Sequence, residues 1–206
     1  MRIELENIAK KFKNEWIFRN LSYTFHTSKS YAILGSNGSG KSTLISIISG
    51  INPASKGELK YVVDEKTLDP DDIHSHISFA APYMELIEEL TLLESLRFHA
   101  KFRPFVSGMD EEAFLERVFL TAHKDKFINQ FSSGMKQRLK LAFALFFQSD
   151  CVLLDEPTTN LDDQGVVWYL ENVQAFSKER ILIISSNNKT EYNFCEEQID
   201  ITNFKK

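Results

Sequence analysis

The sequence predicts an α/β fold with a mostly parallel core sheet, an N-terminal antiparallel β subdomain and an inserted helical subdomain. Short apolar runs at 30–34 and 151–155 are typical of buried parallel strands. The first thirty residues alternate apolar and polar side chains, which favours antiparallel strands. Between about 82 and 148 the pattern changes to that of amphipathic helices.

The size and charge of the chain limit its organisation and its partners. We expect residues 1–206 to form one domain, with a core at 1–81 and 149–206 and a helical subdomain at 82–148. A net charge of −5 argues against direct binding of nucleic acid, because no broad basic field is implied. Two cysteines form no disulfide framework, and no apolar run approaches a membrane span. We therefore expect any membrane role to come through a partner protein.

A phosphate-binding loop is predicted between the expected strand at 30–34 and an expected helix at 43–50. The segment Gly-Ser-Asn-Gly-Ser-Gly-Lys-Ser at 35–42 matches the P-loop template Gly, four residues, Gly-Lys-Ser. Its glycines let backbone N–H groups turn toward a polyphosphate, and the helix N-terminus favours anions. The expected nucleotide-contacting residues are Gly35, Ser36, Asn37, Gly38, Ser39, Gly40, Lys41, Ser42 and Thr43.

Two side chains of this loop receive specific roles. Lys41 is expected to bring positive charge to the terminal phosphates of ATP and to act in catalysis, and Ser42 is expected to ligate Mg²⁺. The motif and its strand–loop–helix context predict a P-loop NTPase.

The N-terminal strands are expected at 2–8 and 16–25, with a third at 58–63. Phe12 and Trp16 fall in the turn between the first two strands. Either ring offers a face for stacking on adenine, and filling the core is an equally weighted alternative. We assign the adenine contact to Phe12 and keep Trp16 as the alternative.

The helical subdomain shows two clear helix starts. Thr91 is followed by Glu94 at the spacing of a capping box. Asp110 is positioned to cap a second helix, with acidic residues in its first turn, that extends to Leu120. Both starts predict helices inserted between the strands of the core.

A second chemical motif follows the apolar run at 151–154, where Asp155 and Glu156 are adjacent. The carboxyl end of a buried parallel strand is where such sheets present functional groups. We expect Asp155 to hold Mg²⁺ through water, and Glu156 to act as the general base that polarises the attacking water.

A third motif makes the resemblance specific. The segment 131–134, Phe-Ser-Ser-Gly, precedes an apolar helix expected at 139–147, upstream of Asp155. With these motifs in this order, nearly the whole chain resembles the nucleotide-binding subunit of an ABC transporter. The segment 160–162 resembles the Asp-loop of that family and 180–186 its late strand. The length resembles compact, haem-exporter-type subunits.

The resemblance implies a mechanism. Two subunits, as a homodimer or a heterodimer, would dock head to tail around two ATP molecules. The signature residues Ser132 and Gly134 of one subunit would meet the γ-phosphate held by the other, although the signature departs from the family's Leu-Ser-Gly-Gly-Gln at 131, 133 and 135. ATP hydrolysis would drive a separate integral membrane permease, which implies a peripheral location on the cytoplasmic face of the membrane.

Two further departures concern hydrolysis. Pro82 stands where the family places a glutamine that ligates magnesium, and Asn187 stands where it places a histidine. A slip of one residue in the late strand would put Ser186 at that position instead. Asn187 is taken as the catalytic counterpart of the histidine. We therefore expect ordinary ATP affinity and slow turnover.

Two alternative functions remain beside transport. One is a soluble ABC-type ATPase that acts as a mechanical switch, and the other is a weakly hydrolysing regulatory nucleotide-binding partner. Soluble relatives usually have two nucleotide domains in one chain or a long coiled-coil insertion. This chain has neither, which favours transport.

Overall fold

The computed structural model describes residues 1–205, which form two compact units. The sheet unit comprises 1–79, 149–156 and 177–205, and the helical unit comprises 80–148 and 157–176. Contacts thus group 157–176 with the helices at 82–148, whereas the sequence-based division assigned that segment to the core.

An antiparallel sheet in the order β2-β1-β4-β5 contains the N-terminal strands. They are β1 (Arg2–Phe12), β2 (Glu15–His26), β4 (Lys56–Val63) and β5 (Lys66–Thr67). β1 pairs with both β2 and β4; burial alternates at Ile3 and Leu5, and the three consecutive residues 8–10 are then all buried. The expected antiparallel β subdomain is confirmed, with longer strands than the alternation alone indicated.

A five-stranded sheet in the order β6-β7-β8-β3-β9 forms the core of the sheet unit. Its strands are β3 (Ser30–Leu34), β6 (Ile77–Ala80), β7 (Cys151–Asp155), β8 (Ile181–Ser185) and β9 (Glu197–Asp200). β7 pairs with β8, and β3 with β8 and β9, all in parallel. β7 and β8 are wholly buried, as an apolar sequence at the centre of a parallel sheet requires.

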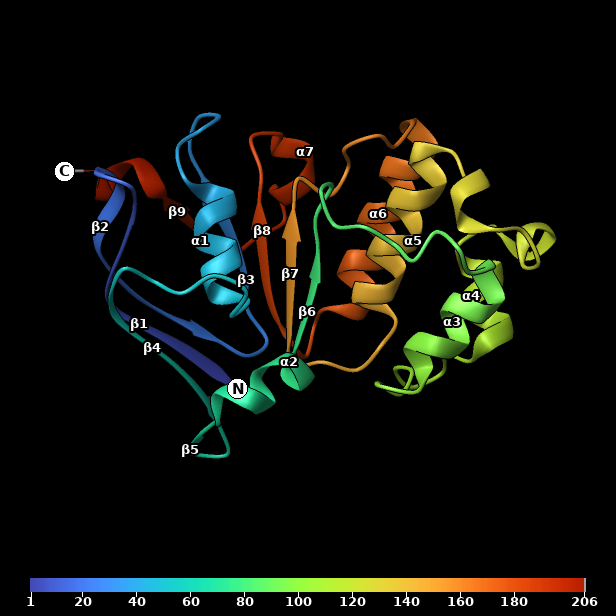
Figure 1. Ribbon diagram of the computed structural model, residues 1–206, viewed down its shortest axis with the longest axis horizontal. Helices are drawn as coiled ribbons and strands as arrows, with labels where there is room; N and C mark the ends of the chain where they lie inside the picture. Colours follow the sequence, from blue (N-terminus) through green and yellow to red (C-terminus); the bar gives the residue numbers. More distant parts are fainter. Residues whose placement is uncertain (206) are drawn as a thin grey trace. The chain divides into compact units, whose positions relative to one another are not determined.

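Helix α1 (Lys41–Ile48) lies between the two sheets (Figure 1). Leu44, Ile45, Ile47 and Ile48 belong to one core cluster with residues of both sheets. Gly50 follows the helix at φ 80°, a left-handed position that ends it. Short helices complete this unit: η1 (Pro70–Asp72), α2 (Ile73–His76), α7 (Lys189–Tyr192) and η4 (Ile201–Phe204).

The helical unit is built on α3 (Leu92–Ala100), α4 (Glu111–Arg117), α5 (Ser133–Leu145) and α6 (Asp163–Phe176). Two short turns, η2 (Thr121–His123) and η3 (Ile128–Gln130), connect α4 to α5. Among residues 1–205, no helix combines the length and apolar character that a membrane crossing requires.

Side-chain caps set the starts of these helices. Thr91 and Glu94 form the expected capping box at α3, and Asp110 caps α4 by accepting from the amide of Ala113. α5 begins at Ser133, six residues before the expected 139. The reason is local, because the Ser132 hydroxyl accepts a hydrogen bond from the Met135 amide and starts the helix there.

Phenylalanine rings form the core of the helical unit, and His99 lies among them. Its ring stacks on Phe143 at 4.6 Å between centroids and meets Phe147 edge-on at 4.5 Å. Burial lowers the pKa of His99 to about 4, with a smaller contribution from the charge of Arg103. His99 is therefore neutral at pH 7.

The pKa of His99 predicts how stability depends on pH. The unfolded chain binds a proton at the ordinary pKa of 6.5 and the folded chain only near 4, so the stability that His99 contributes is lost as pH falls between these values. We expect His99→Phe to reduce the loss of stability between pH 7 and pH 5, measured by urea unfolding. His26→Gln, at an exposed position, is the control. Equal pH dependence in His99→Phe and the parent would contradict the assignment.

Candidate functional site

The predicted phosphate loop connects the end of β3 to the start of α1. Gly38 and Gly40 adopt left-handed φ angles of 74° and 108°. A Cβ atom at Gly40 would lie 2.5 Å from a methyl carbon of Ile17, so only glycine fits between this loop and β2. The loop thereby leads its backbone N–H groups into the first turn of α1.

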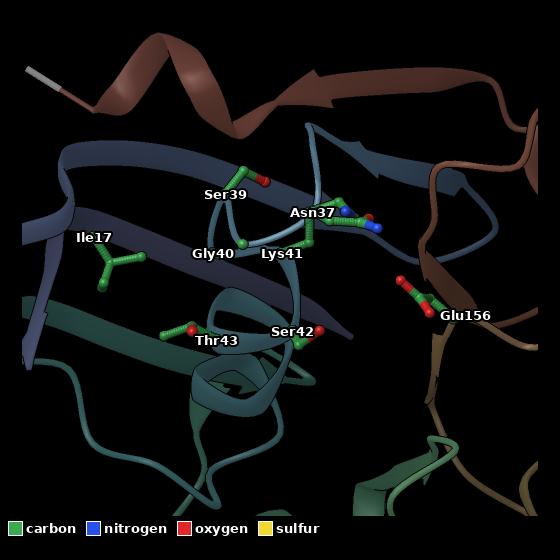
Figure 2. Close-up of a pocket in the computed structure, with 9 residues that line it drawn as sticks. Ile17, Asn37, Ser39, Gly40, Lys41, Ser42, Thr43 and Glu156 are labelled. Carbon is green, nitrogen blue, oxygen red and sulfur yellow. The ribbon is translucent and has the colours of Figure 1, made fainter.

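A pocket of about 220 Å³ opens on this loop. It is lined by residues 37–43 together with Ile17 and Glu156, and Figure 2 shows the last two on opposite sides of the loop. The structure therefore brings together most of the predicted phosphate loop with one of the two predicted carboxylates.

Lys41 is 5 % exposed, and its ammonium is held by the loop itself. Its Nζ donates to the carbonyl oxygens of Gly35 at 2.9 Å and Ser36 at 3.4 Å. Gly35 and Ser36 thus support Lys41, while the pocket is formed by the residues that follow. The buried Ser39 hydroxyl has no hydrogen-bond partner among the described residues. The loop thus suits a polyphosphate, because it combines the unpaired hydroxyl of Ser39, the buried ammonium of Lys41 and the N-terminus of α1.

Asp155 lies at the carboxyl end of β7 and is 1 % exposed. It pairs in register with Ser185 of β8, and the Ser185 hydroxyl donates to its Oδ1 at 2.6 Å. This hydrogen bond orients the carboxylate. Sequence reasoning missed Ser185, although its position at the end of an apolar run, like that of Asp155, was a signal that could have found it.

Glu156 leaves the strand in a left-handed conformation, with φ 41°. Its amide donates to the carbonyl oxygen of Ser185 at 2.8 Å, so β8 holds the turn. A non-glycine residue in this region costs on the order of 1 kcal/mol, and such strain is concentrated at functional sites. The turn separates the two carboxylates, since Asp155 stays within the sheet while the side chain of Glu156 faces the loop (Figure 2).

Asn187 lies beside the phosphate loop, where its side-chain amide donates to Oδ1 of Asn37. The neighbouring Ser186 is 1 % exposed, and its hydroxyl accepts from the amide of Asn188 at 2.8 Å. Of the two candidates for the end of the late strand, Asn187 is therefore the one whose side chain contacts the loop.

Phe12 does not line the pocket among the residues that the structure describes, and its side chain is 53 % exposed. It ends β1, and Trp16 lies within β2, so neither belongs to the turn that joins the strands. Ile17, which sequence reasoning did not single out, takes the lining position. The adenine contact of Phe12 stays a prediction.

The signature residues lie within the helical unit. Ser132 caps α5, and a Cβ atom at Gly134 would lie 3.0 Å from the carbonyl oxygen of Asn160. The buried side chain of Gln137 donates to the carbonyl oxygen of Pro157 at 2.8 Å. These contacts tie the start of α5 to the segment that follows Glu156. Contact of Ser132 and Gly134 with a nucleotide stays a prediction.

Pro82 has a partner that the sequence did not indicate. Lys140 of α5 donates from Nζ to the carbonyl oxygens of Pro82 at 2.7 Å and Ala81 at 3.3 Å. Burial lowers the pKa of Lys140, and the charge of Lys136 adds to this effect. A lysine on a helix thus holds the segment in which the family places a glutamine.

Comparison with known proteins agrees with these observations. The model of the ABC transporter family matches residues 18–159. The ABC transporter ATP-binding protein YybJ of Bacillus subtilis is 34 % identical over 91 % of this chain and 86 % of its own length. The linearmycin resistance ATP-binding protein LnrL of Bacillus subtilis is 31 % identical over 97 % of this chain and 65 % of its own length.

A solved structure shares the fold. It is the dimeric, post-hydrolysis ATP-binding cassette MJ0796 with ADP and Pi, at a TM-score of 0.78 and 23 % identity, over 96 % of this chain and 93 % of that one. The ATP-binding domains of this family are ATPases, and the α/β fold with its parallel and antiparallel sheets is theirs. The phosphate loop, the adjacent carboxylates at the end of β7 and the matched family model together show that this chain belongs to the ABC transporter ATP-binding proteins.

Proposed function

We propose that this chain is the ATP-binding and ATP-hydrolysing subunit of an ABC transporter. It dimerises around two ATP molecules, as a homodimer or a heterodimer, and drives a separate integral membrane permease from the cytoplasmic face. The observation that carries the proposal is the pocket on the phosphate loop, with Glu156 facing that loop, in a chain of this family.

The phosphates of ATP are held by the residues from Gly35 to Thr43. Backbone N–H groups at the start of α1 and the Lys41 ammonium supply the positive potential that a polyphosphate requires. Lys41 exchanges its bonds to the loop carbonyls for bonds to phosphate, which keeps its buried charge paired.

A bound Mg²⁺ would be held by the Ser42 hydroxyl and, through water, by Asp155. Among the described residues no cluster of three His, Cys, Asp or Glu side chains gathers. A cation held by Ser42 and Asp155 would take phosphate and water oxygens for its other ligands, which is the usual coordination of Mg²⁺. When bound, Mg²⁺ neutralises charge on the phosphates.

Glu156 is the general base in this proposal. Its turn out of β7 aims a carboxylate at the loop, where it can accept a proton from a water molecule next to the terminal phosphate. Asn187, held against Asn37, is placed to donate to the developing charge through its amide.

Dimerisation completes the site. The MJ0796 cassette, which shares this fold, is a dimer, and this supports a similar assembly for this chain. In that assembly Ser132 and Gly134, at the N-terminus of α5, supply donors to the γ-phosphate bound by the second subunit.

The family model and the relative YybJ, an ABC transporter ATP-binding protein, support a transporter context. The helical unit exposes large apolar side chains that suit a protein partner. They are Tyr83, Ile87, Phe98, Phe102, Phe119, Phe127 and Val167. Copurification of an integral membrane protein with the chain, expressed at native level, tests the permease against the soluble-switch alternative.

A weakly hydrolysing regulatory partner is the second candidate function. Pro82 and Asn187 favour it, since neither supplies the side chain that the family uses. The retained Glu156 favours an active ATPase.

We expect Lys41→Ala to weaken Mg-ATP binding by about tenfold or more, roughly 1.4 kcal/mol, because the phosphates lose their point charge. Calorimetric titration measures the effect. Lys66→Ala, on exposed β5, is the matched control and should bind like the parent. Identical titration curves for Lys41→Ala and the parent would contradict the phosphate-loop assignment.

Glu156→Gln should slow hydrolysis while ATP remains bound. The glutamine side chain occupies the place of the carboxylate, but its amide cannot take up a proton from the attacking water. An ATP-dependent dimer should then accumulate in gel filtration. Glu171→Gln, at an exposed position of α6, should behave like the parent. A Glu156→Gln chain that stays monomeric at saturating ATP would argue against the sandwich.

The parent should turn over slowly at the chemical step, because a missing transition-state donor typically costs about 10²–10³ in rate. Asn187→His should raise kcat about tenfold or more with little change in ATP affinity, since imidazole supplies a longer donor that can carry charge. Steady-state kinetics measure both, with the exposed Asn193→His as control. Fast turnover in the parent together with an unchanged kcat in Asn187→His would show that another residue donates to the transition state.

A further inference from the structure

A second hollow, of about 400 Å³, lies on β1, β2 and β4, which are adjacent in the antiparallel sheet (Figure 1). All three strands are irregular at its border, because Asn7, Asn20 and Gly57 have left-handed φ angles of 52°, 57° and 90°. A Cβ atom at Gly57 would lie 2.5 Å from the carbonyl oxygens of Asn7 and Glu6, so this close approach requires glycine. Irregularities of this kind bend the strands and open the surface between them.

One wall of the hollow is aromatic and is surrounded by positive charge. Lys11, Arg19 and Lys56 lie 5.5, 5.7 and 5.7 Å from the centroid of the Trp16 ring. Pairing between strands sets this arrangement, since Lys11 is opposite Trp16 and Lys56 is opposite the small residue Ala9. Ala9 lines the hollow and leaves its floor open.

Two of these positive charges, those of Lys11 and Lys56, have no acidic partner among the described residues, whereas Lys60, on the same strand as Lys56, pairs with Glu6 and Glu58. Like charges around one ring repel one another, and an anion between them removes that repulsion. The concentration of cations is notable in a chain with a net charge of −5.

This hollow is separate from the nucleotide pocket. Consecutive residues of a strand point to opposite faces of the sheet. Ile17 lines the pocket on the phosphate loop, and Trp16, its neighbour on β2, lines the hollow.

We propose that this hollow, which we call the Trp16 hollow, binds a small organic anion with a planar apolar body. The apolar body packs on the Trp16 ring, and a phosphate or carboxylate group lies between Lys56 and Arg19, which line the hollow, with Lys11 beside the same ring. The volume is within the range of about 300–1,000 Å³ that is usual for small-molecule sites. Asn7 and Asn20 add polar side chains at the rim.

Phenyl phosphate, titrated against the Lys41→Ala chain so that binding at the phosphate loop is weakened, tests the proposal, and the Lys56 and Lys60 variants below separate the two sites. We expect saturable binding with Kd below about 1 mM, reported by Trp fluorescence and by calorimetry. Trp168 is buried in the helical unit and provides a constant background. Phenylacetate shows whether a carboxylate replaces the phosphate, and benzyl alcohol, which lacks the charge, should not bind.

Matched variants locate the site. In the same background, Lys56→Gln should weaken phenyl phosphate binding by about tenfold, and Lys60→Gln, four residues along β4, should leave it unchanged. Ala9→Leu should abolish binding by filling the floor, with circular dichroism confirming that the chain is folded. If Ala9→Leu unfolds, the comparison of Lys56→Gln with Lys60→Gln still tests the proposal, because Lys56 is exposed.

Three results would overturn the proposal. The first is the absence of saturable binding up to about 10 mM phenyl phosphate, because a Kd above that concentration would mean a negligible affinity. The others are equal affinity of Lys56→Gln and Lys60→Gln, and equal binding of benzyl alcohol and phenyl phosphate.

Discussion

The burial of α1 between two sheets is the constraint on which the nucleotide pocket depends. Leu44, Ile45, Ile47 and Ile48 are at most 1 % exposed and pack in one cluster with both sheets. Burying four such side chains contributes several kcal/mol, at about 1.5–3 kcal/mol each before the loss of entropy. With the helix fixed by this packing, its first turn is held at the pocket, and the N–H groups there need little further ordering to bind an anion. Electrostatic preorganisation of the phosphate loop is thus a consequence of apolar packing.

The ends of β7 and β8 supply the polar groups opposite this loop. Because the two strands are parallel and in register, Asp155 and Ser185 are neighbours and the residues that follow them emerge at the same edge. The hydrogen bond from Ser185 holds the carboxylate of Asp155 inside the sheet, and the left-handed turn at Glu156 sends the next carboxylate toward the loop. Two adjacent acidic residues therefore occupy different environments, which allows them different roles.

The helical unit has its own polar contacts in an otherwise aromatic interior. Lys140 binds the carbonyl oxygens of Ala81 and Pro82, and Gln137 binds that of Pro157. Both side chains project from α5, whose start is set by the cap at Ser132. The segment at Pro82 lacks the family's glutamine side chain but is anchored through its backbone. A helix that starts at the signature motif thus also holds two other segments of the predicted site.

The sequence alone was sufficient for the fold class, the phosphate loop, the capping box at Thr91 and the adjacent carboxylates at the end of β7, because each rests on local spacing and residue chemistry. Contacts between distant segments needed the tertiary structure. Pairing of β7 with β8 brings Ser185 to Asp155, and packing of β2 against the loop brings Ile17 to the pocket. Likewise, the pairing of three strands gathers Lys11, Arg19 and Lys56 around Trp16. Strand register and helix packing decide these neighbours, and neither is written in the spacing of residues along one segment.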